Sequence, residues 1–282
     1  MKTVVGLRVG WGEQTYEVNP NWARLPANLT LGPVTSVAAS PDGRIYLCHR
    51  FEPSVLILDP AGAVVGSLGD GEVIDPHGIT TDLKGNIYVA DRDRHVVVVF
   101  GPDGKLIKEL GTRDHASPEA PFNHPADVAV AANGTTFVAD GYGNSRIHVF
   151  SADGRLIRSW GEAGRGPGQF SVPHGIAVDS RNRVYVADRE NDRVQVFDLA
   201  GTLLDVWDAF RGPTDVSIDE RERIFVSDHI PTVTALDTSG RVLVKIRAYH
   251  DTHGVCCDRA GNVFVASTAG RSVIKYTPVG HA

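Results

Sequence analysis

Three histidines in this chain share one local setting, because each precedes a glycine at the head of an apolar stretch. They are His77 in "DPHGITTD", His174 in "VPHGIAVD" and His253 in "DTHGVCCD". A neutral imidazole is a common ligand of zinc and of related transition ions, whereas calcium prefers oxygen ligands. Three imidazoles around one ion leave a coordination position open, as in catalytic zinc sites. Whether these side chains can meet depends on the fold that carries them.

A sixfold internal repeat surrounds the histidines. Phrases such as "GNIYVAD", "NRVYVAD" and "GNVFVAS" recur, and the six copies begin at residues 43, 85, 134, 182, 222 and 261. This spacing is typical of propeller blades. Each unit contains short β-branched and aromatic runs separated by glycine-rich turns, which predicts three or four strands. We therefore predict an all-β fold, a six-bladed β-propeller in which residues 1–282 form a single domain.

The last repeat lacks a fourth strand, because the chain ends at "KYTPVGHA" after the third. The stretch "TVVGLRVG" (3–10) belongs to no repeat and is the spare segment. Pairing it with the last repeat would close the ring and cover an open sheet edge. We predict that this N-terminal strand closes the propeller.

Superposing the repeats puts the three histidines at one equivalent position, in every second blade. The residues at this position, in blade order, are Thr35, His77, Ala126, His174, Thr214 and His253. Alternate blades of a six-bladed ring stand about 120° apart around a central channel. The histidines must lean inward from the start of the strand, and the glycine after each leaves room for this. We predict that they hold one zinc or related ion; the alternative is that each is a structural residue at the channel mouth.

The loops between second and third strands should surround this ion. They contain Arg50, Arg92, Arg189 and Tyr142. An arginine binds a carboxylate through two hydrogen bonds, and a nearby positive charge favours a phenolate that can accept a proton. We expect Arg92 and Arg193 to be solvated loop residues that pair with Asp188, Glu190 or Asp192. The aspartates at the ends of second strands recur in blades with and without histidine, which favours a structural role for them; they are Asp91, Asp140, Asp188 and Asp228.

Composition limits the possible partners and compartment. A net charge of −6 argues against nucleic acid or an anionic membrane as the main partner, since both require a basic surface. No apolar run is long enough to span a membrane, and the first residues do not read as a signal peptide. Three cysteines are too few for a disulfide framework, so we expect a cytoplasmic protein. The sequence leaves the oligomeric state undetermined.

The repeats also resemble a known family. They look like NHL repeats, and the stretch 124–197, with "DGYGNSRI", "GPGQFSVPH" and "ADRENDRVQ", is similar to the catalytic core of peptidyl-α-hydroxyglycine α-amidating lyases. The resemblance implies an NHL-type six-bladed propeller whose zinc is held by His77, His174 and His253. It further implies that Tyr142 is the catalytic base, that Arg50 keeps Tyr142 anionic and that Arg189 orients a carboxylate of the substrate.

Some positions depart from this family. Gly143 and Val196 stand where the family has cysteines, so the disulfides of its secreted members are not expected. Gly254 replaces an acidic residue that binds calcium in the family, so a structural Ca²⁺ is not expected.

The resulting hypothesis is a zinc-dependent lyase that acts on a small molecule bearing a carboxylate. It would cleave the C–N bond of a carbinolamide and release an amide and a carbonyl product such as glyoxylate. Zinc would acidify the substrate hydroxyl as it acidifies a bound water. Two alternatives remain open: a lactonase-like zinc hydrolase that uses the same histidines, and a binding scaffold without catalysis.

Overall fold

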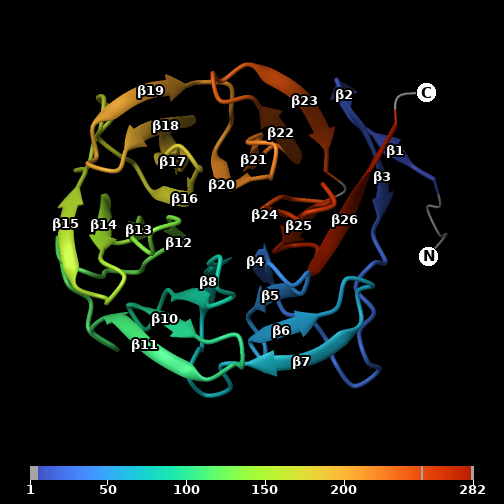
Figure 1. Ribbon diagram of the computed structural model, residues 1–282, viewed down its shortest axis with the longest axis horizontal. Coiled ribbons are helices and arrows are strands. Elements are labelled where there is room, and N and C mark those ends of the chain that lie inside the picture. Colours follow the sequence, from blue (N-terminus) through green and yellow to red (C-terminus); the bar gives the residue numbers. More distant parts are fainter. Residues whose placement is uncertain (1–5, 249, 281–282) are drawn as a thin grey trace.

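Six antiparallel sheets surround a central axis in the computed structural model, which describes residues 6–248 and 250–280 (Figure 1). The predicted six-bladed β-propeller is confirmed. The described residues form one short 3₁₀ helix, η1 (Arg189–Asn191), and otherwise strands and their connections. They include no helix with the length and apolar character that crossing a membrane requires.

The first three blades each consist of four consecutive strands. Blade 1 contains β4 (Val34–Ala39), β5 (Ile45–His49), β6 (Val55–Leu58) and β7 (Val64–Leu68). Blade 2 contains β8 (Pro76–Thr81), β9 (Ile87–Asp91), β10 (Val96–Phe100) and β11 (Leu106–Gly111). Blade 3 contains β12 (Asp127–Val130), β13 (Thr136–Asp140), β14 (Arg146–Phe150) and β15 (Leu156–Trp160).

Blade 4 follows the same plan, and blades 5 and 6 also take in strands from the N-terminal region. Blade 4 contains β16 (Pro173–Val178), β17 (Arg183–Asp188), β18 (Arg193–Asp198) and β19 (Leu203–Trp207). Blade 5 contains β20 (Pro213–Ile218), β21 (Ile224–Asp228), β22 (Thr232–Leu236), β23 (Val242–Arg247) and β2 (Trp11–Gly12). Blade 6 contains β24 (Gly254–Cys257), β25 (Val263–Ser267), β26 (Ser272–Val279), β3 (Thr15–Asn19) and β1 (Arg8–Val9).

The strand that closes the ring is β3, and this corrects the predicted closure by residues 3–10. Strand β3 pairs with β26, with Val18 opposite Tyr276, whereas β1 pairs with the outer side of β3. Residues 3–5 of the predicted strand lie outside the described residues. In β3 the buried Tyr16 and Val18 alternate with exposed Glu17, so one face of the strand enters the core. Closure by an N-terminal strand therefore holds, but the segment is 15–19.

The hydrophobic core lies between blades rather than within them. Six clusters of buried side chains each join two neighbouring blades, and together they complete the ring. Cys256 packs into the cluster shared with blade 1, and its neighbour Cys257 packs against the cluster shared with blade 5. Successive strand residues thus serve opposite interfaces, so each blade depends on both neighbours for burial.

The first strand of each blade lies nearest the axis (Figure 1). In blades 1, 2, 4 and 5 this strand contains one extra residue relative to the second strand, close to its start. The register passes from Pro76 opposite Asp91 to Gly78 opposite Ala90, which leaves His77 unpaired between them. Such a β-bulge redirects a side chain that regular pairing would place on a blade face. It is the feature that can turn a residue toward the axis.

Candidate metal centre

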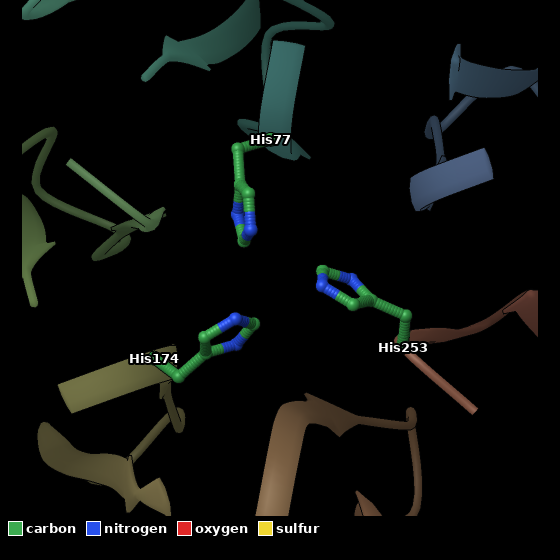
Figure 2. A group of neighbouring side chains, drawn as sticks. All are labelled: His77, His174 and His253. Carbon is green, nitrogen blue, oxygen red and sulfur yellow. The ribbon is translucent and has the colours of Figure 1, made fainter. Parts of the chain in front are cut away.

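His77, His174 and His253 point toward one another across the axis (Figure 2). Their ring centroids are 4.8 to 4.9 Å apart, and their nearest ligand atoms lie within 4.8 Å of one another. Among the residues that the structure describes, no other cluster of three such side chains has this geometry. The structure therefore brings together the three histidines that the repeat alignment singled out.

Local backbone geometry aims each imidazole at the axis. His77 and His174 occupy the bulges of β8 and β16, and His253 directly precedes β24 while its amide bonds to Ala266 of the second strand. The sequence-based expectation that the side chains lean inward before regular pairing begins agrees with this arrangement. For His77 and His174 the bulge supplies its physical cause.

Each imidazole donates a hydrogen bond from Nδ1 to a backbone carbonyl of the next blade. His77 bonds to Ala126 O at 2.8 Å, and His174 bonds to Thr214 O at 2.6 Å. His253 bonds to Thr35 O at 2.6 Å. A carbonyl oxygen can only accept, so Nδ1 carries the hydrogen and Nε2 of the neutral ring keeps its lone pair. The three carbonyls thus fix the tautomer in which Nε2 can bind a metal.

The glycine after each histidine is required by the neighbouring blade. A Cβ on Gly78 would lie 2.6 Å from Ala126 O, the acceptor of His77, and 2.3 Å from an Asp127 carboxyl oxygen. A Cβ on Gly175 would similarly lie 2.9 Å from Thr214 O, the acceptor of His174. The sequence reading explained these glycines by space for the imidazole. The structure shows instead that they admit the backbone that holds the imidazole.

Blades 1, 3 and 5, which lie between the histidine blades, also form hydrogen bonds to those blades. They do so through the residue that is equivalent to the glycine after each histidine. Ser36 Oγ accepts the amide of Ile79 at 3.3 Å, Asp127 accepts that of Ile176 at 2.9 Å, and Asp215 accepts that of Val255 at 2.8 Å. With the three Nδ1 bonds these make a closed hydrogen-bond circle of six links, one between every pair of neighbouring blades. The circle ties the positions of all three imidazoles to one another.

The sequence analysis overlooked the acceptors of this circle. Ser36, Asp127 and Asp215 alternate with Gly78, Gly175 and Gly254 one residue after the aligned position, so the signal was present in the repeat. Their partners lie in other blades, up to 49 residues away in sequence for Asp127 and Ile176. Reading each repeat alone could not reveal such bonds.

Asp127 and Asp215 are buried carboxyl groups that line one small pocket together with the three imidazoles. Burial, and then the charge of Asp215, raises the pKa of Asp127 well above its usual range, and burial raises the pKa of Asp215 to about 7. Burial and the closeness of the two carboxyl groups thus disfavour a negative charge on both at once. Both also line a cavity of about 300 Å³, whose other lining residues come mostly from the first strands of the blades.

The three imidazoles are held neutral by their surroundings. Burial lowers the pKa of His77 and His174 well below the usual value, and a neighbouring imidazole of the cluster adds to this effect in each case. Burial likewise lowers the pKa of His253 to about 4. A neutral imidazole is the form that binds metal.

Tyr142 reaches the histidine cluster from the loop between β13 and β14. Its hydroxyl oxygen lies 2.9 Å from Nε2 of His77 and 2.9 Å from Nε2 of His174. The loop is held close to its neighbours, because a Cβ on Gly141 would lie 2.0 Å from Pro173 O and one on Gly143 would overlap Asn123. The ring remains partly exposed, so a substrate can reach it.

Two guanidinium groups lie over the Tyr142 ring, each 5.4 Å from its centroid, and they belong to Arg189 and Arg92. Arg189 Nη1 also donates to the Tyr142 hydroxyl at 3.3 Å. Arg50 pairs with Asp75 at 2.9 Å. Geometrically, then, Arg189 stands next to the phenol, where the resemblance implied Arg50.

Arg92 was expected to be solvated, and this expectation was wrong. Its side chain is 22 % exposed and pairs with Asp75 at 2.8 Å while it stacks on Tyr142. Arg193 pairs with Asp188 at 2.8 Å, as expected, but it is buried rather than solvated. The position of an arginine in its loop is therefore not enough to predict whether its side chain faces the axis or a neighbouring loop.

The strand-end aspartates bond to loop groups, as their recurrence indicated. Asp91 accepts the amides of Ile74 and Asp75, and Asp188 accepts that of Ser171. Asp140 accepts the amide of Asn123, and Asp228 accepts the hydroxyl of Thr232. These carboxylates hold the loops that carry the arginines and Tyr142.

The donor set fits a divalent transition ion. Three Nε2 lone pairs face a common centre, and the single hydroxyl hydrogen of Tyr142 can satisfy only one of the two nitrogens it touches. A cation would satisfy all three lone pairs at once. Imidazole ligands favour zinc or a related ion over calcium.

The fold and the repeats define the class of the protein. The chain is a six-bladed β-propeller, and three of its stretches match the NHL repeat model, residues 74–100, 122–150 and 170–197. A gluconolactonase from Xanthomonas campestris shares this fold, with a TM-score of 0.74, 15% sequence identity and coverage of 94% of this chain and 90% of that one.

Within this class the chain resembles peptidyl-α-hydroxyglycine α-amidating lyases. It is 40% identical over 195 residues to a probable lyase of this kind from Caenorhabditis elegans, covering 59% of this chain and 56% of that one. It is 42% identical over 156 residues to mouse peptidyl-glycine α-amidating monooxygenase, covering 52% of this chain but only 16% of the mouse protein. Human NHL repeat-containing protein 3 is 27% identical over 94% of this chain and 84% of its own length.

Proposed function

We propose that this protein is a zinc-dependent lyase that cleaves the C–N bond of a carbinolamide carrying a carboxylate. The products would be an amide and a carbonyl compound such as glyoxylate. The observation that carries the proposal is the Tyr142 hydroxyl, which lies against two of the three converging imidazoles and beside a guanidinium. The similarity to named amidating lyases supports the same reaction.

His77, His174 and His253 would hold the metal through Nε2, and a bound divalent ion would supply Lewis-acid chemistry at the substrate hydroxyl. Tyr142 would accept the hydroxyl proton. The electron pair of that O–H bond then forms the carbonyl while the C–N bond breaks. The amide nitrogen takes the proton back from Tyr142, so protons and electrons balance.

The arginines would divide two tasks. Arg189 donates to the Tyr142 hydroxyl and would hold this oxygen in place as it accepts the proton. Arg50 is fixed through Nε by Asp75, and its Nη1 and Nη2 have no partner among the described residues. Two parallel N–H groups match a carboxylate, so we assign the substrate carboxylate to Arg50.

Glyoxylate release from an N-acyl-α-hydroxyglycine, by protein with measured zinc content, tests the proposal. We expect activity in the wild type and at least about a 100-fold lower kcat in Tyr142→Phe, because general-base catalysis contributes on this order. Zinc content should be equal in both proteins. A fully zinc-loaded wild type with no activity on several such substrates would refute the lyase.

The same variant separates the alternatives. A lactonase-like hydrolase would use an activated water and should retain most of its activity in Tyr142→Phe. A binding scaffold would bind no stoichiometric metal and would convert neither class of substrate. Lactone hydrolysis measured beside glyoxylate release distinguishes all three outcomes.

We also propose a cytoplasmic location, supported by the cysteines. Cys48, Cys256 and Cys257 are all free, and the first two are buried. Free buried thiols are typical of a reducing compartment. Titration of the unfolded protein should find three thiols, and a smaller number would contradict this location.

A further inference from the structure

Arg92 occupies the position in blade 2 that Arg50 and Arg189 occupy in blades 1 and 4. Each directly follows the last residue of a second strand. Each donates its backbone amide to the residue two places before the aligned position: Arg50 to Pro33 O, Arg92 to Asp75 O and Arg189 to Val172 O. Three blades therefore present a guanidinium to the metal centre from equivalent loops.

Asp75 joins two of these arginines. One of its carboxyl oxygens lies 2.9 Å from Nε of Arg50, and the other lies 2.8 Å from Nη2 of Arg92. The Asp75 side chain is 13 % exposed, so this contact is largely sheltered from solvent. Nε of Arg92 also contacts Asp93, whose side chain is 51 % exposed. Asp75 is thus the common anchor of an arginine pair, Arg50 and Arg92.

The charges at this anchor decide what Arg50 can bind. Asp75 alone would neutralise Arg50, and its negative charge would repel an incoming carboxylate. With Arg92 on its other oxygen, two positive charges face one sheltered negative charge, and the pair stays cationic. Asp93 is half-exposed, so water screens its charge more strongly than that of Asp75.

We propose that Arg92 is a specificity-determining residue. Its positive charge offsets the negative charge of Asp75, the residue that holds Arg50. Arg50 therefore binds substrates with a free carboxylate in preference to their esters and amides. This inference rests on the proposed function only in taking Arg50 as the carboxylate-binding group. The substrate class it names is α-hydroxy acid derivatives whose carboxylate is ionised.

Binding of glycolate and of glycolamide to the zinc-loaded protein, measured by calorimetry, tests the inference without any turnover. We expect Arg92→Gln to weaken glycolate binding about tenfold and to leave glycolamide binding unchanged. Arg92→Lys should restore most of the glycolate affinity, because it keeps the charge. Arg94→Gln is the matched control, since Arg94 lies in the same loop but pairs with Asp114 at 2.9 Å; its binding should equal that of the wild type.

The outcomes separate this inference from the lyase proposal. Glycolate affinity within twofold of the wild type in Arg92→Gln, or an equal loss for both ligands, overturns the inference even if glyoxylate release is intact. A wild type that binds neither ligand overturns it too. Arg92-dependent glycolate binding by a protein that releases no glyoxylate supports the inference and refutes the lyase. In an active enzyme, Arg92→Gln should raise KM about tenfold for the acid and should not raise it for the methyl ester.

Discussion

The histidine blades (2, 4 and 6) and the intervening blades (1, 3 and 5) use equivalent strand positions for different purposes. A histidine blade presents an imidazole and then a glycine, whereas an intervening blade presents a backbone carbonyl and then Ser36, Asp127 or Asp215. The carbonyl receives the imidazole of the preceding blade, and the side chain receives an amide of the next one. The difference teaches that, at this strand position, three blades supply the metal-binding imidazoles and the other three orient them.

The largest effect should follow from removing a group of the histidine blades. His174→Ala leaves two imidazoles, so we expect zinc affinity to fall at least about 100-fold and lyase activity to disappear. Elemental analysis and a competing chelator measure the loss. His115→Ala, at an exposed position outside the cluster, is the control and should retain full zinc. Stoichiometric zinc in His174→Ala would refute the three-histidine site.

The glycine of a histidine blade tests the contact between the two kinds of blade. Gly78→Ala would push against Ala126 O and the Asp127 carboxyl, so we expect unfolding to become easier by about 2 kcal/mol and zinc affinity to fall about tenfold. Gly66→Ala in β7 is the control, because its nearest neighbour would lie 3.8 Å away. Urea unfolding and zinc titration give both quantities. Equal stability of the two variants would contradict the close approach of the blades.

The intervening blades should show a smaller effect that depends on hydrogen bonding rather than charge. Asp127→Ala leaves the buried amide of Ile176 without its acceptor, at a cost of about 1–2 kcal/mol. Asp127→Asn keeps an acceptor and removes one of two adjacent carboxyl groups, so we expect stability within about 1 kcal/mol of the wild type. Denaturation near neutral pH measures both. If Asn were as harmful as Ala, the charge of Asp127 would matter more than its bond.

The smallest effect should be that of mild acid on zinc binding. The pKa of metal-free His253 is lowered from 6.5 to about 4, so the folded protein keeps this imidazole neutral until the pH approaches 4. We expect bound zinc to change little between about pH 7 and about pH 5.5, and to fall nearer pH 4. The unfolded chain takes up protons from about pH 6.5 downward, so the metal-free protein should lose stability over this window. Zinc loss centred near pH 6.5 would show that the imidazoles are not sheltered.

Much of the candidate site could be read from repetition. The aligned position located His77, His174 and His253 because six similar strands place equivalent residues at equal heights around the axis. Loop position singled out Tyr142 and Arg189, and the resemblance supplied their roles; the structure brings Tyr142 to the imidazoles and Arg189 to Tyr142. Arg92 was misjudged because its partners, Asp75 and Tyr142, come from other loops. A loop arginine's direction depends on charges that sequence neighbours do not reveal.

The sequence by itself determined the number of blades, their strand pattern and the alternation of histidine with other residues, because each of these is a local or periodic property. Tertiary structure alone decided which N-terminal segment closes the ring, since the amphipathic strand β3 buries Tyr16 and Val18 only when β26 is beside it. It also decided the tautomer of each imidazole and the partners of each arginine. Those depend on carbonyls, amides and charges of neighbouring blades, and folding brings them within hydrogen-bonding distance across tens to hundreds of residues, as many as 218 for His253 and Thr35.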